Sequence, residues 1–179
     1  MIYLFLAEGF EEVEALAPVD LLRRAGAQIR TVGVGDRHVT GSHHIEVTAD
    51  LEENEISLEN MDMVILPGGM PGTKNLEQSP MVRACLNYCA QNGKWIAAIC
   101  AAPSILGHFG LLKGHKAVCF PGYEDELGAE EVLMDPVCVS GRIITSRGAG
   151  VAVEFGLKII EELFGSEKSL EIRKKIQCI

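Results

Sequence analysis

Short apolar runs separated by helical stretches are the feature that most constrains the fold of this chain. The run at residues 63–66 is apolar at every position. A strand without polar positions is buried on both faces, as happens when helices cover both sides of a parallel sheet. The pattern therefore predicts an α/β fold, a flavodoxin-like, doubly wound and mostly parallel sheet with helices on both faces. The expected strands are 2–6, 29–34, 62–66, 95–99 and 143–146.

The helices expected between the strands have recognisable ends. Ser79-Pro80 is a cap and first-turn pair for a helix that runs to Gln91. Gly26 ends a first helix over 11–25, and Gly165 divides a final pair, 151–164 and 166–175. Because no stretch rich in proline, glycine or serine divides the chain, we expect a single domain over residues 1–179.

Open parallel sheets bind ligands at the carboxyl ends of their strands. Functional residues are therefore expected in the four segments that directly follow strands: residues 8–14, 67–69, 100–103 and 146–148. We expect all four to line one edge of the sheet.

The junction at Cys100 has no turn residue between strand and helix, so only a tight elbow fits. An elbow exposes its central side chain at the sheet edge and needs small neighbours, such as Ala98 and Ala101. A helix beginning at Ala101 would direct free amide groups at the sulfur and lower the thiol pKa below about 8.5. Cys100 is therefore the predicted reactive residue, in preference to a buried structural thiol.

Glycines and carboxylates follow two other strands. The glycine pair at 68–69 could supply paired amides for an oxyanion hole, although tight turns use glycine whatever their function. Glu8, Glu11 and Glu14 lie near the start of the first helix, where the helix dipole favours negative charge. A carboxyl turned from this helix toward Cys100 would have a raised pKa and could donate a hydrogen bond to sulfur. The residues alone leave open which carboxyl does so.

The charge balance argues against nucleic acid as a partner. Sixteen basic and 25 acidic residues give a net charge of −9, and no basic cluster offsets it. No apolar run approaches the roughly 20 residues that a membrane-spanning helix needs. The first residues lack a basic leader and a cleavage site. We therefore expect a cytoplasmic protein that binds neither nucleic acid nor membrane.

The six cysteines and five histidines do not form a metal-binding pattern. Cys85 and Cys89 share a predicted helix face, but no second pair completes a site, so we expect buried thiols and no metal. No disulfide framework is expected in a reducing compartment. His43 and His44 are adjacent in a polar stretch, and such histidines are usually solvated rather than directed into a partner subunit's pocket.

Five motifs resemble the DJ-1/PfpI (ThiJ) superfamily, in its DJ-1-like branch. They are GFEEVE at 9–14, PVDLLRRAG at 18–26, VILPGG at 64–69, AAICAAP at 97–103 and TSRGAG at 145–150. The resemblance covers nearly the whole chain and implies the fold already expected from the strand pattern.

The resemblance also implies roles for individual residues. Cys100 would be the nucleophile, Glu14 its protonated carboxyl partner, and the amides of Gly69 and Ala101 the oxyanion donors, with no cofactor. Family members are typically homodimers with the site near the subunit interface. The first helix is expected to leave apolar surface for a partner at Val13, Leu16 and Val19.

Two departures from the family pattern limit the activity that can be carried over. Ala101 follows the cysteine where protease or amidase branches have histidine, so neither activity is expected. Phe120 stands where the closest-looking branch often has a histidine. Beside it, Cys119 is either a core thiol or a resolving partner for Cys100. Gly68 and Arg147 are the remaining supporting residues.

Two functions fit these residues. The first is an enzyme that acts on small reactive carbonyl compounds such as methylglyoxal or glyoxal, in the manner of a cofactor-independent glyoxalase or deglycase. The alternative is an oxidative-stress sensor or protective protein in which Cys100 is oxidised to sulfinate without efficient turnover. Both functions use the same cysteine.

Overall fold

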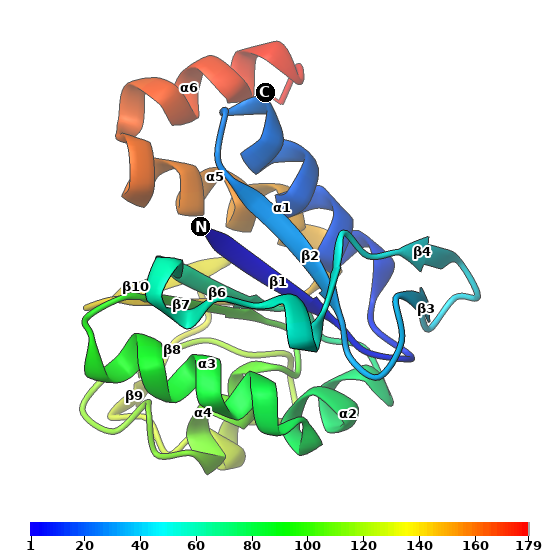
Figure 1. The fold of residues 1–179 in the computed structure, drawn as a ribbon. Helices are drawn as coiled ribbons and strands as arrows, with labels where there is room; N and C mark the ends of the chain where they lie inside the picture. Colours follow the sequence, from blue (N-terminus) through cyan, green and yellow to red (C-terminus); the bar gives the residue numbers. More distant parts are fainter. Residues whose placement is uncertain (179) are drawn as a thin grey trace.

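A seven-stranded sheet forms the middle layer of the computed structural model, which describes residues 1–178 (Figure 1). Residue 179, the last of the expected domain, lies outside the described part. The sheet order is β10-β11-β7-β6-β1-β2-β5, parallel except where β10 pairs antiparallel with β11. This confirms the predicted doubly wound, mostly parallel sheet. The strands are β1 Ile2–Leu6, β2 Ile29–Gly33, β5 Leu51–Glu52, β6 Met63–Leu66, β7 Trp95–Ile99, β10 Val137–Ser140 and β11 Ile143–Ser146.

Helices cover both faces of the sheet (Figure 1). One face carries α1, α5 and α6, and the other carries α2, α3 and α4. Within residues 1–178, no helix combines the length and apolar character needed to cross a bilayer. The helices are α1 Glu12–Arg24, α2 Gly72–Gln78, α3 Pro80–Gln91, α4 Pro103–His108, α5 Ala152–Phe164 and α6 Ser166–Lys175.

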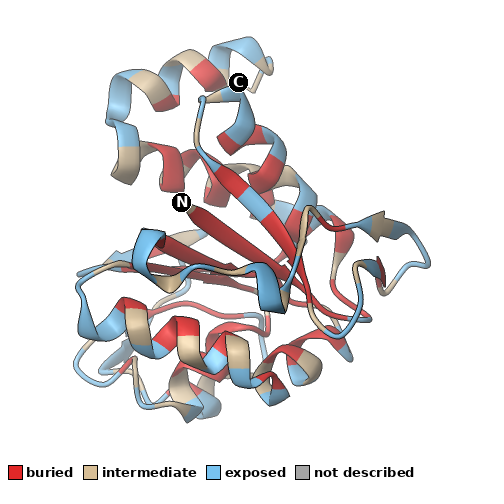
Figure 2. Cartoon of the chain, viewed as in Figure 1, coloured by how far each residue is buried: buried red, intermediate tan, exposed pale blue. Residues whose placement is uncertain are grey.

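Alternate side chains of each central strand enter two separate apolar cores. In β1, Ile2, Leu4 and Leu6 pack with residues of α1 and α5, whereas Tyr3 and Phe5 pack with residues of α3 and α4. Side chains of successive strand residues point to opposite faces, so a strand between two helical layers needs apolar residues at every position. Figure 2 shows the consequence, because the central strands are buried along their whole length.

The predicted elements agree closely with the observed ones. The five predicted strands are all present, and no strand end differs from its predicted position by more than one residue. The Ser79 hydroxyl caps α3 by accepting from the Val82 amide at 3.1 Å, as the Ser79-Pro80 pair predicts. The shorter strands were missed because two to four residues carry too little periodicity. Besides β5 and β10, these are the hairpin β3 His38–Thr40 with β4 Glu46–Thr48, and the pair β8 Lys116–Ala117 with β9 Glu131–Val132.

The strand order gathers the four predicted junctions at one edge. Strand β1 leads through α1 to β2 on one side, whereas β6 leads through α2 and α3 to β7 on the other. The winding direction therefore reverses between β1 and β6, which is where open α/β sheets form a ligand crevice. The paired register of Leu66 with Ala98, and of Ser146 with Ile99, brings the ends of β6, β7 and β11 level with one another.

The outer face of α1 is only partly as expected. Val13 and Leu16 are 52% and 36% exposed, whereas Val19 is 6% exposed. The expectation of surface exposure is therefore wrong for Val19. Val19 belongs to the apolar core between α1, α5 and the sheet, one helical turn after the buried Ala15.

Helix α5 approaches α1 closely because residue 156 is glycine. A Cβ atom at Gly156 would lie 2.6 Å from a methyl carbon of Leu21 and 3.1 Å from the Cα of Pro18. We expect Gly156→Val to lower the free energy of unfolding by about 1–3 kcal/mol through overpacking. Gly156→Ala is the matched control, because its gain of about 1 kcal/mol in helix propensity offsets the milder contact. Chemical denaturation measures both, and equal stability of the two variants would contradict the packing argument.

Candidate functional site

Cys100 occupies a strained elbow directly after β7. Its φ angle is +65°, a left-handed conformation that costs a residue with a Cβ of order 1 kcal/mol or more. Two backbone hydrogen bonds hold it there: the Cys100 amide donates to Ser146 at 2.9 Å, and its carbonyl accepts from Phe120 at 2.8 Å. A turn through 101 and 102 precedes α4, which begins at Pro103 rather than at Ala101 as expected.

The glycine loop after β6 passes against the elbow with no space for a side chain. A Cβ atom at Gly68 would lie 2.7 Å from the Cβ of Cys100 and 2.7 Å from Oε2 of Glu14. Gly69 has φ +91°, and a Cβ there would lie 2.4 Å from the amide nitrogen of Glu11. The amides of Ala101 and Gly69 both act to lower the pKa of the Cys100 thiol, so both lie near its sulfur. The structure thus brings the two expected oxyanion donors to the thiol.

Glu14 is the carboxyl that the structure turns toward Cys100. It lies in the first turn of α1 and is 1% exposed, and its Oε2 faces Cys100 across Gly68, where a Cβ atom would lie 2.7 Å from each. Its Oε2 also accepts from the Gly68 amide at 2.9 Å. Burial, with a smaller contribution from the charge of Glu11, raises the pKa of Glu14 to about 7. Hydrogen bonds from Cys100 and from the amides of Gly68 and Ala149 oppose that rise.

The environment of the thiol reverses one expectation from the sequence. Burial, the negative charge of Glu14 and the hydrogen bond to Glu14 raise the pKa of Cys100 to about 12. The amides of Ala101 and Gly69 lower it, but by less. The expectation of a thiol pKa below about 8.5 is therefore wrong. It considered the amides, which lower the pKa, but not burial and the Glu14 carboxylate, which raise it by more.

Glu14 and Cys100 consequently hold at most one negative charge between them near neutral pH. The carboxyl loses its proton first, since the pKa of Glu14 is about 7 and that of Cys100 about 12. A thiolate then forms when the thiol proton passes to the Glu14 carboxylate. Groups coupled in this way titrate as a pair. The arrangement can deliver a nucleophilic sulfur and a proton carrier in contact with each other.

Arg147 and Phe120 line a cavity near this pair. Arg147 donates from Nη1 to the carbonyl of Met134 at 3.0 Å and lines a cavity of about 430 Å³ together with Phe120. Phe120 is 47% exposed. A Cβ at Gly148 would lie 3.2 Å from the Phe120 ring and 3.8 Å from Oε1 of Glu14, so the cavity lies close to the carboxyl.

The other cysteines are mostly buried. Cys119 is 5% exposed in the core beneath α3 and α4, and burial raises its pKa to about 11. Cys85 and Cys89 are both 0% exposed on α3, which confirms that they are buried core thiols. Cys138 is also buried, whereas Cys178 is partly exposed. The placement of Cys119 favours its interpretation as a core thiol.

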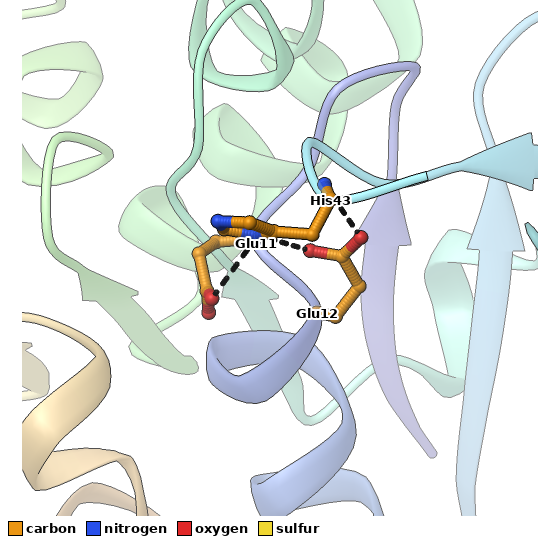
Figure 3. A group of neighbouring side chains, drawn as sticks. All are labelled: Glu11, Glu12 and His43. Atoms are coloured by element: carbon orange, nitrogen blue, oxygen red, sulfur yellow. Dashed lines mark hydrogen bonds and ion pairs between the residues drawn. The ribbon is translucent and has the colours of Figure 1, made fainter. Parts of the chain in front are cut away.

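Glu12 has a structural role beside the site that the sequence reasoning did not assign. It is 4% exposed and binds the segment before β4, accepting from the His43 amide at 2.8 Å and from His43 Nδ1 at 3.0 Å (Figure 3). Burial acts to raise the pKa of Glu12, but the hydrogen bonds from His43 and Ile45 outweigh it and the pKa falls. Glu12 in turn raises the pKa of His43. The run of acidic residues at 11, 12 and 14 was the available signal.

The three side chains drawn in Figure 3 also meet the spacing of a metal site. One ligand atom from each of Glu11, Glu12 and His43 lies within 4.8 Å of the others. The carboxylates are already occupied, however, because Glu11 caps the Glu14 amide at 2.8 Å and Glu12 accepts from several donors. We therefore assign the cluster a structural role: it fastens the β3–β4 hairpin to the start of α1. His44 is exposed, as expected.

Comparison with known proteins identifies relatives over nearly the whole chain. The model of the DJ-1/PfpI family matches residues 1–162. Protein DJ-1 homologs B and A of Arabidopsis thaliana are 36% and 37% identical, and this chain spans only 39% and 44% of their length. A Caenorhabditis elegans protein named glutathione-independent glyoxalase DJR-1.2 is 33% identical over 94% of this chain and 91% of its own.

A solved structure shows the same fold. Toxoplasma gondii DJ-1, described as oxidized, is 38% identical and superposes with a TM-score of 0.95, covering 98% of this chain and 97% of its own.

The raised pKa of Glu14 predicts a specific dependence of stability on pH. The fold favours the protonated carboxyl, so this contribution to the free energy of unfolding is fully present below pH 4.5 and is lost as pH rises through about 7. We expect the stability of wild type relative to Glu14→Gln to fall by roughly 3 kcal/mol across that interval. Urea denaturation at several pH values measures the difference. Glu162→Gln on α5 is the control, and a difference independent of pH in Glu14→Gln would contradict the assignment.

Proposed function

The chain belongs to the DJ-1/PfpI family, and from that premise we propose that it uses Cys100 as a nucleophile on small reactive carbonyl compounds, without a cofactor. The observation that carries the proposal is the buried Glu14 carboxyl, which packs beside Cys100 across the Gly68 backbone. The name of the C. elegans relative supports the substrate class, of which methylglyoxal and glyoxal are the simplest members. Removal of the same carbonyl groups from protein adducts is the related deglycase activity.

In the first step the Glu14 carboxylate accepts the thiol proton while the sulfur adds to the aldehyde carbon. A C–S bond forms, the C=O π bond breaks, and negative charge moves to the aldehyde oxygen. The amides of Gly69 and Ala101 are the proposed donors to that oxygen. Return of the proton from Glu14 gives a neutral hemithioacetal on Cys100.

The second step transfers hydrogen within the substrate. The hemithioacetal carbon loses its C–H proton while the neighbouring carbonyl oxygen gains one, which gives an enediol. The second carbon of the enediol then gains a proton while the hydroxyl on the sulfur-bearing carbon loses one, which gives a thioester with a neighbouring hydroxyl group. One carbon is thereby oxidised and the other reduced, so no external oxidant is needed. Water then cleaves the resulting thioester, which releases a 2-hydroxy acid and restores the thiol. Glu14 is the proposed proton carrier in these transfers.

A redox role at the same cysteine is the alternative. The related T. gondii structure is described as oxidized. In addition, residue 120 is a phenylalanine, whose side chain cannot transfer protons during turnover. Peroxide would convert the thiolate to sulfenate with release of water, and a second peroxide would give sulfinate. Protonated Glu14 could then donate a hydrogen bond to the new oxygen. Stoichiometric oxidation without dicarbonyl turnover would favour this role, and multiple turnovers would favour the enzyme.

Replacing Glu14 should change turnover and thiol reactivity in opposite directions. We expect Glu14→Gln to lower methylglyoxal turnover by about 10²-fold or more, because the proton carrier is lost. Alkylation of Cys100 at pH 7 should become faster, because removing the carboxylate charge lowers the thiol pKa from its value of about 12. Product assay and mass spectrometry after brief iodoacetamide treatment measure the two effects.

Two further variants complete that experiment. Cys100→Ser should have no turnover, and Glu59→Gln, at an exposed site away from the elbow, should behave as wild type. Unchanged turnover in Glu14→Gln would remove Glu14 from the mechanism and make Glu11 or Glu12 the next carboxyl to test.

We also propose that the protein is a homodimer through the outer face of α1. Val13 and Leu16 are 52% and 36% exposed, and Ile45, whose amide donates to Glu12 at 3.4 Å, is 53% exposed. Val13 and Leu16 are three residues apart on α1 and therefore share a helix face, and exposed apolar side chains that lie together are typical of an interface.

Charge substitutions on this face should produce monomers. We expect light scattering of wild type to give the mass of two chains, and Val13→Lys combined with Leu16→Lys to give the mass of one, because a buried unpaired lysine opposes association. Leu170→Lys is the control, since Leu170 is 50% exposed on α6. A monomeric wild type at micromolar concentration would overturn the proposal.

A further inference from the structure

A second cavity, of about 560 Å³, opens at the opposite edge of the sheet from Cys100. Its lining includes residues at or just before the amino ends of β1, β2, β6, β7 and β11, together with the end of α5. The N label at the start of β1 marks this edge in Figure 1. The volume lies within the range of roughly 300–1,000 Å³ that small-molecule sites occupy. None of the chemistry proposed at Cys100 involves these residues.

An arginine stacked on an indole forms the polar part of the cavity. The guanidinium carbon of Arg142 lies 4.7 Å from the centroid of the Trp95 ring. Trp95 is 8% exposed, whereas Arg142 is exposed. Stacking on an aromatic face holds the guanidinium plane in place and leaves its edge N–H groups free to bind a planar anion.

The charges around the cavity favour an anionic ligand. Asp62 is already paired, with Lys94 Nζ at 3.0 Å and with the amino group of Met1 at 2.6 Å. Across residues 1–178, Arg142 has no carboxylate partner. In a protein whose net charge is −9, this lining therefore has more positive than negative groups.

The apolar part of the cavity is aromatic and accessible. Phe164, the last residue of α5, is 45% exposed and lines the cavity with the partly buried Leu163. An exposed ring and an unpaired guanidinium that line one cavity match a ligand with one flat ring and one anionic group. We propose that this cavity binds aromatic carboxylates, with the carboxylate paired to Arg142 and the ring packed on Phe164.

Trp95 provides a direct readout, because it is the only tryptophan in the chain and gives one indole N–H signal. The probes are 1-naphthoate and its neutral isostere 1-naphthamide, titrated into ¹⁵N-labelled wild type. We expect naphthoate to shift the Trp95 indole signal and the amide to bind about tenfold or more weakly, since it lacks the charge-assisted pair. Arg142→Gln should weaken naphthoate binding by about tenfold or more for the same reason.

The chain supplies a matched control for the arginine. The guanidinium carbon of Arg83 lies 4.9 Å from the centroid of the Phe109 ring, and neither residue lines the cavity. Arg83→Gln should therefore leave naphthoate binding unchanged. Cys100→Ser should also bind naphthoate as wild type does, which makes this result independent of the proposed activity. The proposal is overturned by equal affinity for acid and amide, by unchanged binding in Arg142→Gln, by loss of binding in Cys100→Ser, or by a Trp95 signal that naphthoate does not move.

Discussion

The reactive edge of the molecule depends on the close passage of the Gly68 backbone between α1 and the elbow. A Cβ atom there would lie 2.7 Å from both the Cys100 Cβ and the Glu14 carboxyl. Without a side chain at 68, the loop can donate its amide to Glu14 at 2.9 Å and bring the next amide, that of Gly69, near the Cys100 sulfur. A glycine permits such an approach because it has no Cβ. The carboxyl, the thiol and the two nearby amides are therefore held together by backbone geometry.

Burial of this cluster decides its chemistry. A carboxyl and a thiol that are both shielded from water cannot both be charged, so one proton is shared between them. That arrangement is unsuited to a thiol that is permanently ionised, and suited to one that ionises when a proton carrier accepts its proton. The same coupling serves both the enzymatic and the redox role, because carbonyl addition and peroxide oxidation each need the thiolate and each benefit from a proton donor beside the new oxygen.

The sheet presents two chemically different edges. At the carboxyl ends of the strands, backbone amides and buried acidic groups surround a small reactive centre. At the amino ends, an exposed arginine and exposed aromatic surface face a wider cavity. Both edges exist because a parallel sheet ends all its strands in register, which collects residues from distant parts of the sequence.

Local pattern and composition determined the strand sequence, the helix caps and the elbow. Three features depend on residues that are neighbours in the sequence, so they could be predicted from it. They are the burial of the strand at 63–66, the Ser79 cap and the strained elbow at Cys100. Tertiary structure decided the rest. Which glutamate faces the sulfur, how Glu12 binds the β3–β4 hairpin, and the upward direction of the Cys100 pKa all depend on contacts between segments far apart in the chain. Desolvation and charge coupling act through space, and a single sequence does not record those distances.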